Sequence, residues 1–171
     1  TGANIPFAIR ARVVLLRDLG APLSPYNAFQ IIQGLETVAL RIKQHCSNAE
    51  KVVDFLSGNK KVKNVIYPTQ YKGEIADRAK KYMKGGYGSL IGMDLGTKEA
   101  GAQFIDKLKM LYHVANIGDA RSLAIHPATT THSQLTEEEM LAARVTPGYV
   151  RLSIGIERPD DILADIKQAL A

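Results

Sequence analysis

Apolar residues recur at intervals of three and four in the first third of the chain, which is typical of amphipathic helices. The pattern predicts a short helix over residues 5–19, which Gly20 ends. Ser24 followed by Pro25 is a typical helix start, and a second helical pattern runs from there to Leu56. Its apolar face is predicted to comprise Ala28, Phe29, Ile32, Leu35, Ala39, Ile42, Cys46, Ala49, Val53 and Leu56. Because about thirty helical residues span roughly 45 Å, we expect a helix that links two parts of a molecule.

After Gly58 the hydrophobic period alternates between that of strands and that of helices. Strands are predicted at residues 62–67, 88–95, 112–115, 122–126 and 149–156. Helices are predicted at residues 74–83, after Thr97, after Thr136 and from Pro159 onward, and Thr136 with Glu139 has the spacing of a capping box. The fold class is therefore α/β, a small sheet covered by helices. We expect a helical extension in residues 1–57 and an α/β domain in residues 58–171.

Composition excludes several classes of protein. Apolar residues make up 46% of the chain, and no apolar run approaches the roughly 18 residues that cross a bilayer. The net charge is +5, but the basic clusters do not interleave with aromatic residues and no nucleic-acid motif is present. A single cysteine, Cys46, excludes a disulfide framework and fits a cytoplasmic protein. The N-terminal Thr1-Gly2-Ala3 has no starting Met, which leaves either processing or a piece of a longer chain.

Neither a metal site nor a phosphate loop is predicted. The four histidines do not form a ligand set, and His126 and His132 have no carboxylate between them. The glycine-rich stretch at residues 85–88 precedes a strand, so it lacks the helix N-terminus that would hold phosphate.

Two segments carry candidate chemistry. In the strand at residues 149–156, Arg151 points away from the apolar face, and an arginine on a rigid strand can hold a carboxylate through two parallel hydrogen bonds. The alternative is an ordinary surface arginine. The second segment, residues 116–123, contains Asn, Gly and Asp between two predicted strands, which by itself predicts a hairpin connection.

Three stretches together resemble the Cys/Met-metabolism family of pyridoxal-phosphate (PLP) enzymes, which contains cystathionine gamma-synthase, methionine gamma-lyase and O-acetylhomoserine sulfhydrylase. They are LGAPLSPYNAFQIIQGLETVALR (19–41), NIGDARSLAIHPATTTH (116–132) and TPGYVRLSIGIERPDDILADI (146–166). The resemblance implies the C-terminal small domain of a fold-type I PLP enzyme, with a mostly antiparallel sheet, preceded by a long linking helix.

The resemblance also implies roles for individual residues. The R-L-S-x-G-x-E pattern falls on Arg151 to Glu157, so Arg151 would grip the substrate α-carboxylate. Asn116 stands where the lyases have serine, beside that carboxylate, and this departure resembles the sulfhydrylase branch. The Schiff-base lysine of the family follows Ser-x-Thr, and no lysine of this chain stands in that context. We therefore expect no catalytic lysine here and PLP bound mainly by an N-terminal domain.

For the whole enzyme, the resemblance implies γ-replacement on O-acetyl-L-homoserine. Sulfide or methanethiol would replace acetate, giving homocysteine or methionine, in a cytoplasmic homotetramer. The alternatives are a methionine gamma-lyase or cystathionine gamma-synthase. A different class remains open from the residues alone, a non-catalytic α/β interaction domain whose face around Arg151 meets a protein partner.

Overall fold

The computed structural model describes residues 5–171, so the N-terminal Thr1-Gly2-Ala3 and the start of the expected extension lie outside the described residues. The chain separates into two compact units, with the boundary between Ala39 and Leu40. Our boundary between residues 57 and 58 remains a prediction about domain organisation. No described helix is long and apolar enough to cross a membrane.

The first unit is helical. Pro6 opens the first segment at a first-turn position, and Gly20 ends it in the left-handed conformation, with φ of 64°. Ser24 caps the next helix by accepting a hydrogen bond from the Asn27 backbone N–H at 3.2 Å. The elements are α1 (Pro6–Arg10), a π-helical turn η1 (Ala11–Leu16), α2 (Arg17–Leu19) and α3 (Pro25–Glu36).

The apolar stripe of α3 is exposed in this chain. Phe29, Ile32 and Leu35 are 57%, 54% and 61% exposed. Contiguous apolar surface of this kind marks a face that another protein segment covers. The sequence pattern identified the stripe, and the exposed fractions confirm that residues 25–39 do not bury it themselves.

One expectation about the helices was wrong. The pattern from Ser24 to Leu56 forms two helices, α3 and α4 (Val38–Ser57), which Thr37 separates with φ of −108° and ψ of 2°. Gly34, Thr37 and Val38 are weak helix formers, so propensity is low at the break even though the apolar period continues through it. Periodicity reports which face is apolar and does not detect where one helix ends and the next begins.

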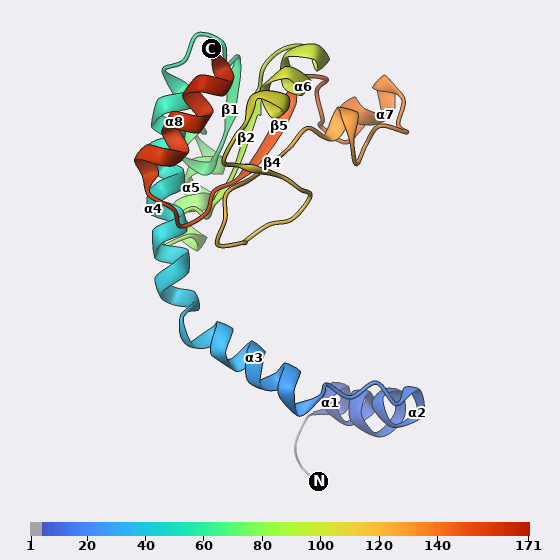
Figure 1. Ribbon diagram of the computed structural model, residues 1–171. Helices are drawn as coiled ribbons and strands as arrows, with labels where there is room; N and C mark the ends of the chain where they lie inside the picture. Colours follow the sequence, from blue (N-terminus) through green and yellow to red (C-terminus); the bar gives the residue numbers. More distant parts are fainter. Residues whose placement is uncertain (1–4) are drawn as a thin grey trace. The chain divides into compact units, whose positions relative to one another are not determined.

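The second unit contains a five-stranded sheet in the order β1-β2-β5-β4-β3 (Figure 1). Neighbouring strands are antiparallel except β3 and β4, which are parallel. Residues 116–123 are therefore not the hairpin connection that turn composition predicts, because a hairpin joins antiparallel strands. The strands are β1 (Asn64–Ile66), β2 (Leu90–Asp94), β3 (Tyr112–His113), β4 (Leu123–Ile125) and β5 (Tyr149–Ser153).

The four helices that follow α4 begin where the sequence predicts. The side chain of Thr97 caps α6, and Thr136 with Glu139 forms the predicted capping box at α7. Two short 3-10 turns, η2 (Pro68–Gln70) and η3 (Pro127–Thr129), follow β1 and β4. The helices are α5 (Glu74–Tyr82), α6 (Lys98–Lys107), α7 (Glu137–Ala142) and α8 (Pro159–Leu170).

The main core lies on one face of the sheet. Val150, Leu152 and Ile154, at alternate positions along the central strand and its end, are fully buried against α4, α6 and α8. Figure 1 shows α4 and α8 on the same side of the sheet. Cys46 is buried, as expected for a small core residue. The alternate positions of β5 face the other way, where the candidate site lies.

Candidate substrate carboxylate site

Arg151 occupies the middle of the central strand. It pairs with Gly92 of β2 on one side and with Ile125 of β4 on the other. Val150 and Leu152, its neighbours along the strand, are buried in the main core, so the pleat directs Arg151 to the opposite face. Hydrogen bonding to a strand on each side makes this backbone position rigid, which suits a residue that must orient a ligand.

The guanidinium of Arg151 is incompletely paired. Its Nη2 donates a long hydrogen bond of 3.4 Å to the backbone carbonyl of Asn116. Its Nε is buried and has no hydrogen-bond partner among the residues that the structure describes. A buried N–H without an acceptor is unfavourable, and a planar guanidinium matches the two oxygens of a carboxylate. The arrangement can therefore bind a carboxylate.

The segment that carries Asn116 lies against this strand. The Gly118 N–H donates to Ser153 Oγ at 3.2 Å, and the Ile156 N–H donates to the Ala120 carbonyl at 2.9 Å. The structure thus brings Asn116 and Arg151 together across 35 residues of sequence, through the Asn116 backbone carbonyl. The Asn116 residue itself is exposed, so its side chain is accessible to a ligand.

Tyr149 shares the Arg151 face, two positions earlier on β5, and sequence reasoning missed it. Burial raises the pKa of the Tyr149 hydroxyl, and the positive charge of Arg151 acts in the opposite direction. Gly92 leaves room for its ring, because a Cβ there would stand 2.7 Å from a Tyr149 ring carbon. The strand period, which places residues 149 and 151 on one face, was the signal that could have found Tyr149.

The buried histidines serve the fold. His126 is fully buried, with Nε2 2.8 Å from the Pro147 carbonyl and Nδ1 3.0 Å from Thr129 Oγ1, so both ring nitrogens have partners. Nδ1 of His45, 2.6 Å from the Ile154 carbonyl, holds the end of β5. Within residues 5–171, no three His, Cys, Asp or Glu side chains are grouped to hold a metal ion.

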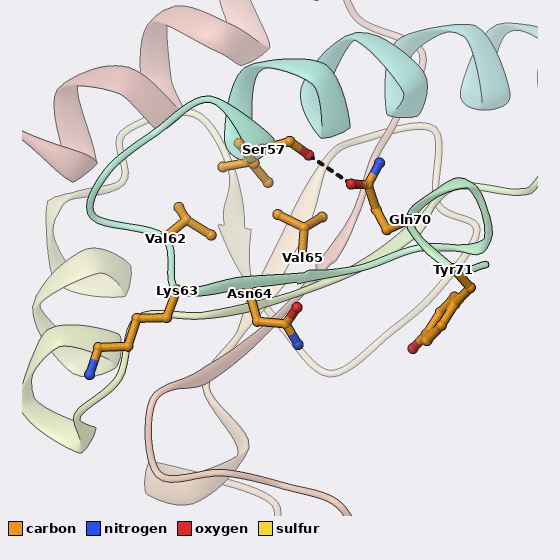
Figure 2. A pocket seen from close by; sticks show the side chains of 8 residues that line it. Ser57, Val62, Lys63, Asn64, Val65, Gln70 and Tyr71 are labelled. Carbon is orange, nitrogen blue, oxygen red and sulfur yellow. Dashed lines mark hydrogen bonds between the residues drawn. The ribbon is translucent and has the colours of Figure 1, made fainter.

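Two hollows of the second unit lie near β1, and neither includes Arg151. Figure 2 shows one of about 240 Å³, lined by Val62, Lys63, Asn64 and Val65 with a Ser57–Gln70 hydrogen bond of 3.2 Å beside them. A second, of about 440 Å³, is apolar and lies between α5 and the strands β1 and β2. Neither hollow contains Arg151, whose buried Nε has no partner among the described residues.

Comparison with known proteins gives relatives along nearly the whole chain. It is 50% identical over 171 residues to O-acetyl-L-homoserine sulfhydrylase of Leptospira meyeri, covering 99% of this chain and 39% of that protein. It is 44% identical over 169 residues to O-acetyl-L-homoserine sulfhydrylase 1 of Thermus thermophilus, covering 98% of this chain and 40% of that protein. The chain therefore spans about two fifths of the length of these relatives.

Solved structures agree with this relationship. A putative O-acetylhomoserine (thiol)-lyase of Campylobacter jejuni, whose crystal structure contains a pyridoxyl-lysine, matches with a TM-score of 0.89 and 45% identity over 98% of this chain and 40% of that one. The model of the family described as Cys/Met metabolism PLP-dependent enzyme matches residues 4–171. Since that match spans almost every residue and the fold agrees, the chain belongs to the Cys/Met-metabolism family of PLP-dependent enzymes.

Proposed function

We propose that this chain is part of an O-acetylhomoserine sulfhydrylase and that Arg151 holds the α-carboxylate of the amino-acid substrate. The observation that carries the proposal is the buried Nε of Arg151, which has no acceptor among the described residues. The relatives named O-acetylhomoserine sulfhydrylase support the reaction class. On this proposal the substrate carboxylate supplies the acceptor that the folded chain lacks.

The donor set fits a carboxylate and does not fit attachment of PLP. A guanidinium offers N–H donors in a fixed fork, whereas PLP attachment requires a lysine, and no lysine here follows Ser-x-Thr. PLP, when bound, supplies the electron sink that makes the bonds at the substrate Cα and Cβ labile. We assign its attachment to the part of the protein outside these residues. This chain contributes orientation, because a carboxylate held at Arg151 limits rotation of the substrate about Cα.

The first test replaces Arg151 in the full-length enzyme. A charge-assisted contact of this kind contributes a few kcal/mol, so Arg151→Ala should lower kcat/KM for O-acetylhomoserine by about 100-fold or more. The free energy of unfolding should change by less than about 0.5 kcal/mol, because no complete hydrogen-bond network is lost. Arg78→Ala, which removes an exposed arginine of α5, is the matched control. Near-normal kinetics in Arg151→Ala would show that Arg151 binds no substrate.

The branch of the family is a separate part of the proposal. We infer γ-replacement with sulfide or methanethiol in preference to γ-elimination of methionine, supported by the names of the relatives and by Asn116 in place of serine. An amide offers two donors and an acceptor, so it can hold a carboxylate and still accept a hydrogen bond. This would favour a substrate orientation in which the reaction intermediate stays bound until the external thiol adds to it.

Comparing two substrates with the full-length enzyme tests the branch. We expect kcat/KM for O-acetylhomoserine with sulfide to exceed that for methionine alone by at least about tenfold, which corresponds to roughly 1.4 kcal/mol. Equal efficiency on methionine would overturn the sulfhydrylase assignment. If Asn116→Ser leaves the ratio unchanged, the physical reason given for Asn116 is wrong while the assignment stands.

The partners follow from the same proposal. We propose that the exposed stripe containing Phe29, Ile32 and Leu35 is covered by the rest of the full-length protein or by another subunit. The whole enzyme is proposed to be a cytoplasmic homotetramer. The mass of the native full-length enzyme, measured by light scattering, tests this, and a monomer would contradict the assembly.

A further inference from the structure

We propose that Glu157 is a positioning residue that holds the segment 116–122 against β5, so that Asn116 and Arg151 keep the spacing a carboxylate requires. The inference deepens the proposed function and rests on it, because it assigns Glu157 a role through Arg151. Glu157 follows β5 and precedes α8, and it has no direct contact with Arg151 in the hydrogen bonds of the described residues. Its influence would pass through Ser122.

Ser122 is the point at which Glu157 holds the segment. One carboxylate oxygen of Glu157 accepts the Ser122 backbone N–H at 2.6 Å, and the other accepts the Ser122 hydroxyl at 3.0 Å. The Ser122 Oγ in turn accepts the Gly155 N–H at 2.8 Å. Ser122 is fully buried, so these bonds form in a low-dielectric setting where charge-assisted hydrogen bonds are strong.

Gly155 allows the segment to lie directly on the chain that follows β5. A Cβ at this position would collide with the Ala120 carbonyl oxygen, the Arg121 carbonyl carbon and a carboxylate oxygen of Glu157. The absence of a side chain therefore permits both the close approach of residues 120–121 and the path of the Glu157 side chain. Arg151, Gly155 and Glu157 therefore all contact the segment 116–122.

Glu157 is itself held from the helix side. Asn48 of α4 donates to the Gly155 carbonyl at 3.0 Å and to the Glu157 carbonyl at 2.8 Å. His45, one turn earlier, contacts the Ile154 carbonyl at 2.6 Å. The backbone at residues 154–157 is thus attached to the buried face of α4, and the Glu157 carboxylate extends from there to Ser122.

Geometry links these contacts to the carboxylate site. Ser122 begins the stretch that leads into β4, and the same segment carries the Asn116 carbonyl, which accepts from Arg151 Nη2. If Glu157 no longer held Ser122, the segment would lose two of the hydrogen bonds that hold it against β5 and the residues after β5, while those to Ser153, Gly155 and Ile156 would remain. We expect Arg151 then to lose its orientation, which weakens binding of a carboxylate more than it weakens other contacts with the substrate.

The experiment is a double-mutant cycle in the full-length enzyme. Wild type, Glu157→Ala, Arg151→Ala and the double variant are assayed with O-acetylhomoserine and with its α-carboxamide. Glu157→Ala should lower kcat/KM for the acid by about tenfold, mainly through KM, and that for the carboxamide by less than about twofold. In the Arg151→Ala background its effect on the acid should fall below about twofold, because coupled residues are not additive.

Control variants keep the test decisive. Ser122→Ala removes the bridging hydroxyl but retains the backbone N–H, so it should weaken binding of the acid by about threefold in the same direction. It replaces Glu157→Ala if that variant does not fold. Glu99 is an exposed acidic residue in the first turn of α6, and Glu99→Ala should leave kcat/KM unchanged for both substrates.

Each result has a defined meaning. An equal loss for both substrates, or an equal loss in both backgrounds, would show that Glu157 serves only the fold and would overturn this inference alone. If Arg151→Ala does not reduce discrimination between acid and carboxamide, the proposed function fails, and this inference fails with it.

Discussion

Asp165 on α8 and Arg151 on β5 are both charged groups inside the second unit, and they differ in how completely they are paired. The carboxylate of Asp165 accepts the backbone N–H groups of Lys109, Met110 and Leu111 at 2.9, 2.8 and 3.0 Å, and Gln168 donates to it at 2.9 Å. Arg151 makes one long hydrogen bond and leaves a buried Nε without an acceptor among the described residues.

The difference in pairing corresponds to a difference in role, because Asp165 connects parts of the fold whereas Arg151 is proposed to bind a ligand. Asp165 joins α8 to the turn between α6 and β3, and the protein itself supplies every partner that its two oxygens use. Arg151 lies on the central strand of the sheet, and on our proposal its partner is the substrate carboxylate. Because a buried polar group without a partner is unfavourable, the unpaired Nε supports our proposal that Arg151 binds a carboxylate.

The largest expected effect on stability is at Asp165. Asp165→Ala should lower the free energy of unfolding by about 3 kcal/mol, because three backbone N–H groups lose their shared acceptor. Urea unfolding of the full-length enzyme measures this, with Asp161→Ala in the exposed first turn of α8 as the control. If Asp165→Ala loses no more free energy of unfolding than the control, the comparison fails, because the complete pairing of Asp165 would then contribute nothing to stability.

A smaller effect is expected from Arg151→Lys. Lysine keeps the positive charge but lacks the planar fork, so it should recover only part of the activity lost in Arg151→Ala and remain about tenfold below wild type in kcat/KM. Steady-state kinetics with O-acetylhomoserine measures this. Full recovery would show that the site requires charge alone and that the unpaired Nε is unimportant.

The smallest effect is a dependence of stability on pH at Asp165. Partial burial acts to raise the pKa of its carboxyl, but the hydrogen bonds from Leu111, Lys109, Met110 and Gln168 outweigh burial and hold it below its ordinary value. A carboxyl whose pKa is lowered by folding stabilises the protein above its unfolded-state pKa, and this contribution is lost as pH falls through the folded-state pKa.

Comparison with an uncharged variant isolates that contribution. At neutral pH, Asp165→Asn should unfold at a lower urea concentration than wild type. This difference in urea midpoint should become smaller as the pH is lowered through the range in which carboxyl groups titrate. If the difference in urea midpoint between the two proteins does not change with pH, the charge of Asp165 does not contribute to its hydrogen bonds.

Most elements could be predicted from local pattern. The alternation at residues 149–156 identified the central strand and assigned Arg151 to the face opposite Val150 and Leu152. The spacing of Thr136 and Glu139 predicted the capping box that is present at α7. These predictions succeeded because each depends on residues within one or two turns of each other. The apolar stripe of α3 was also visible in the sequence, since amphipathic period is a local property, and the structure added that it is exposed.

By itself, the sequence determined the kinds of elements, the α/β class and, through its resemblance to a family, the candidates Arg151 and Asn116. Only the tertiary structure decided that β3 and β4 are parallel and that α3 and α4 are separate. It also revealed that Glu157 reaches Ser122, 35 residues away. The physical reason is range: propensity and period act between neighbours in sequence, whereas pairing of strands and of buried polar groups depends on which distant residues the packed core brings together.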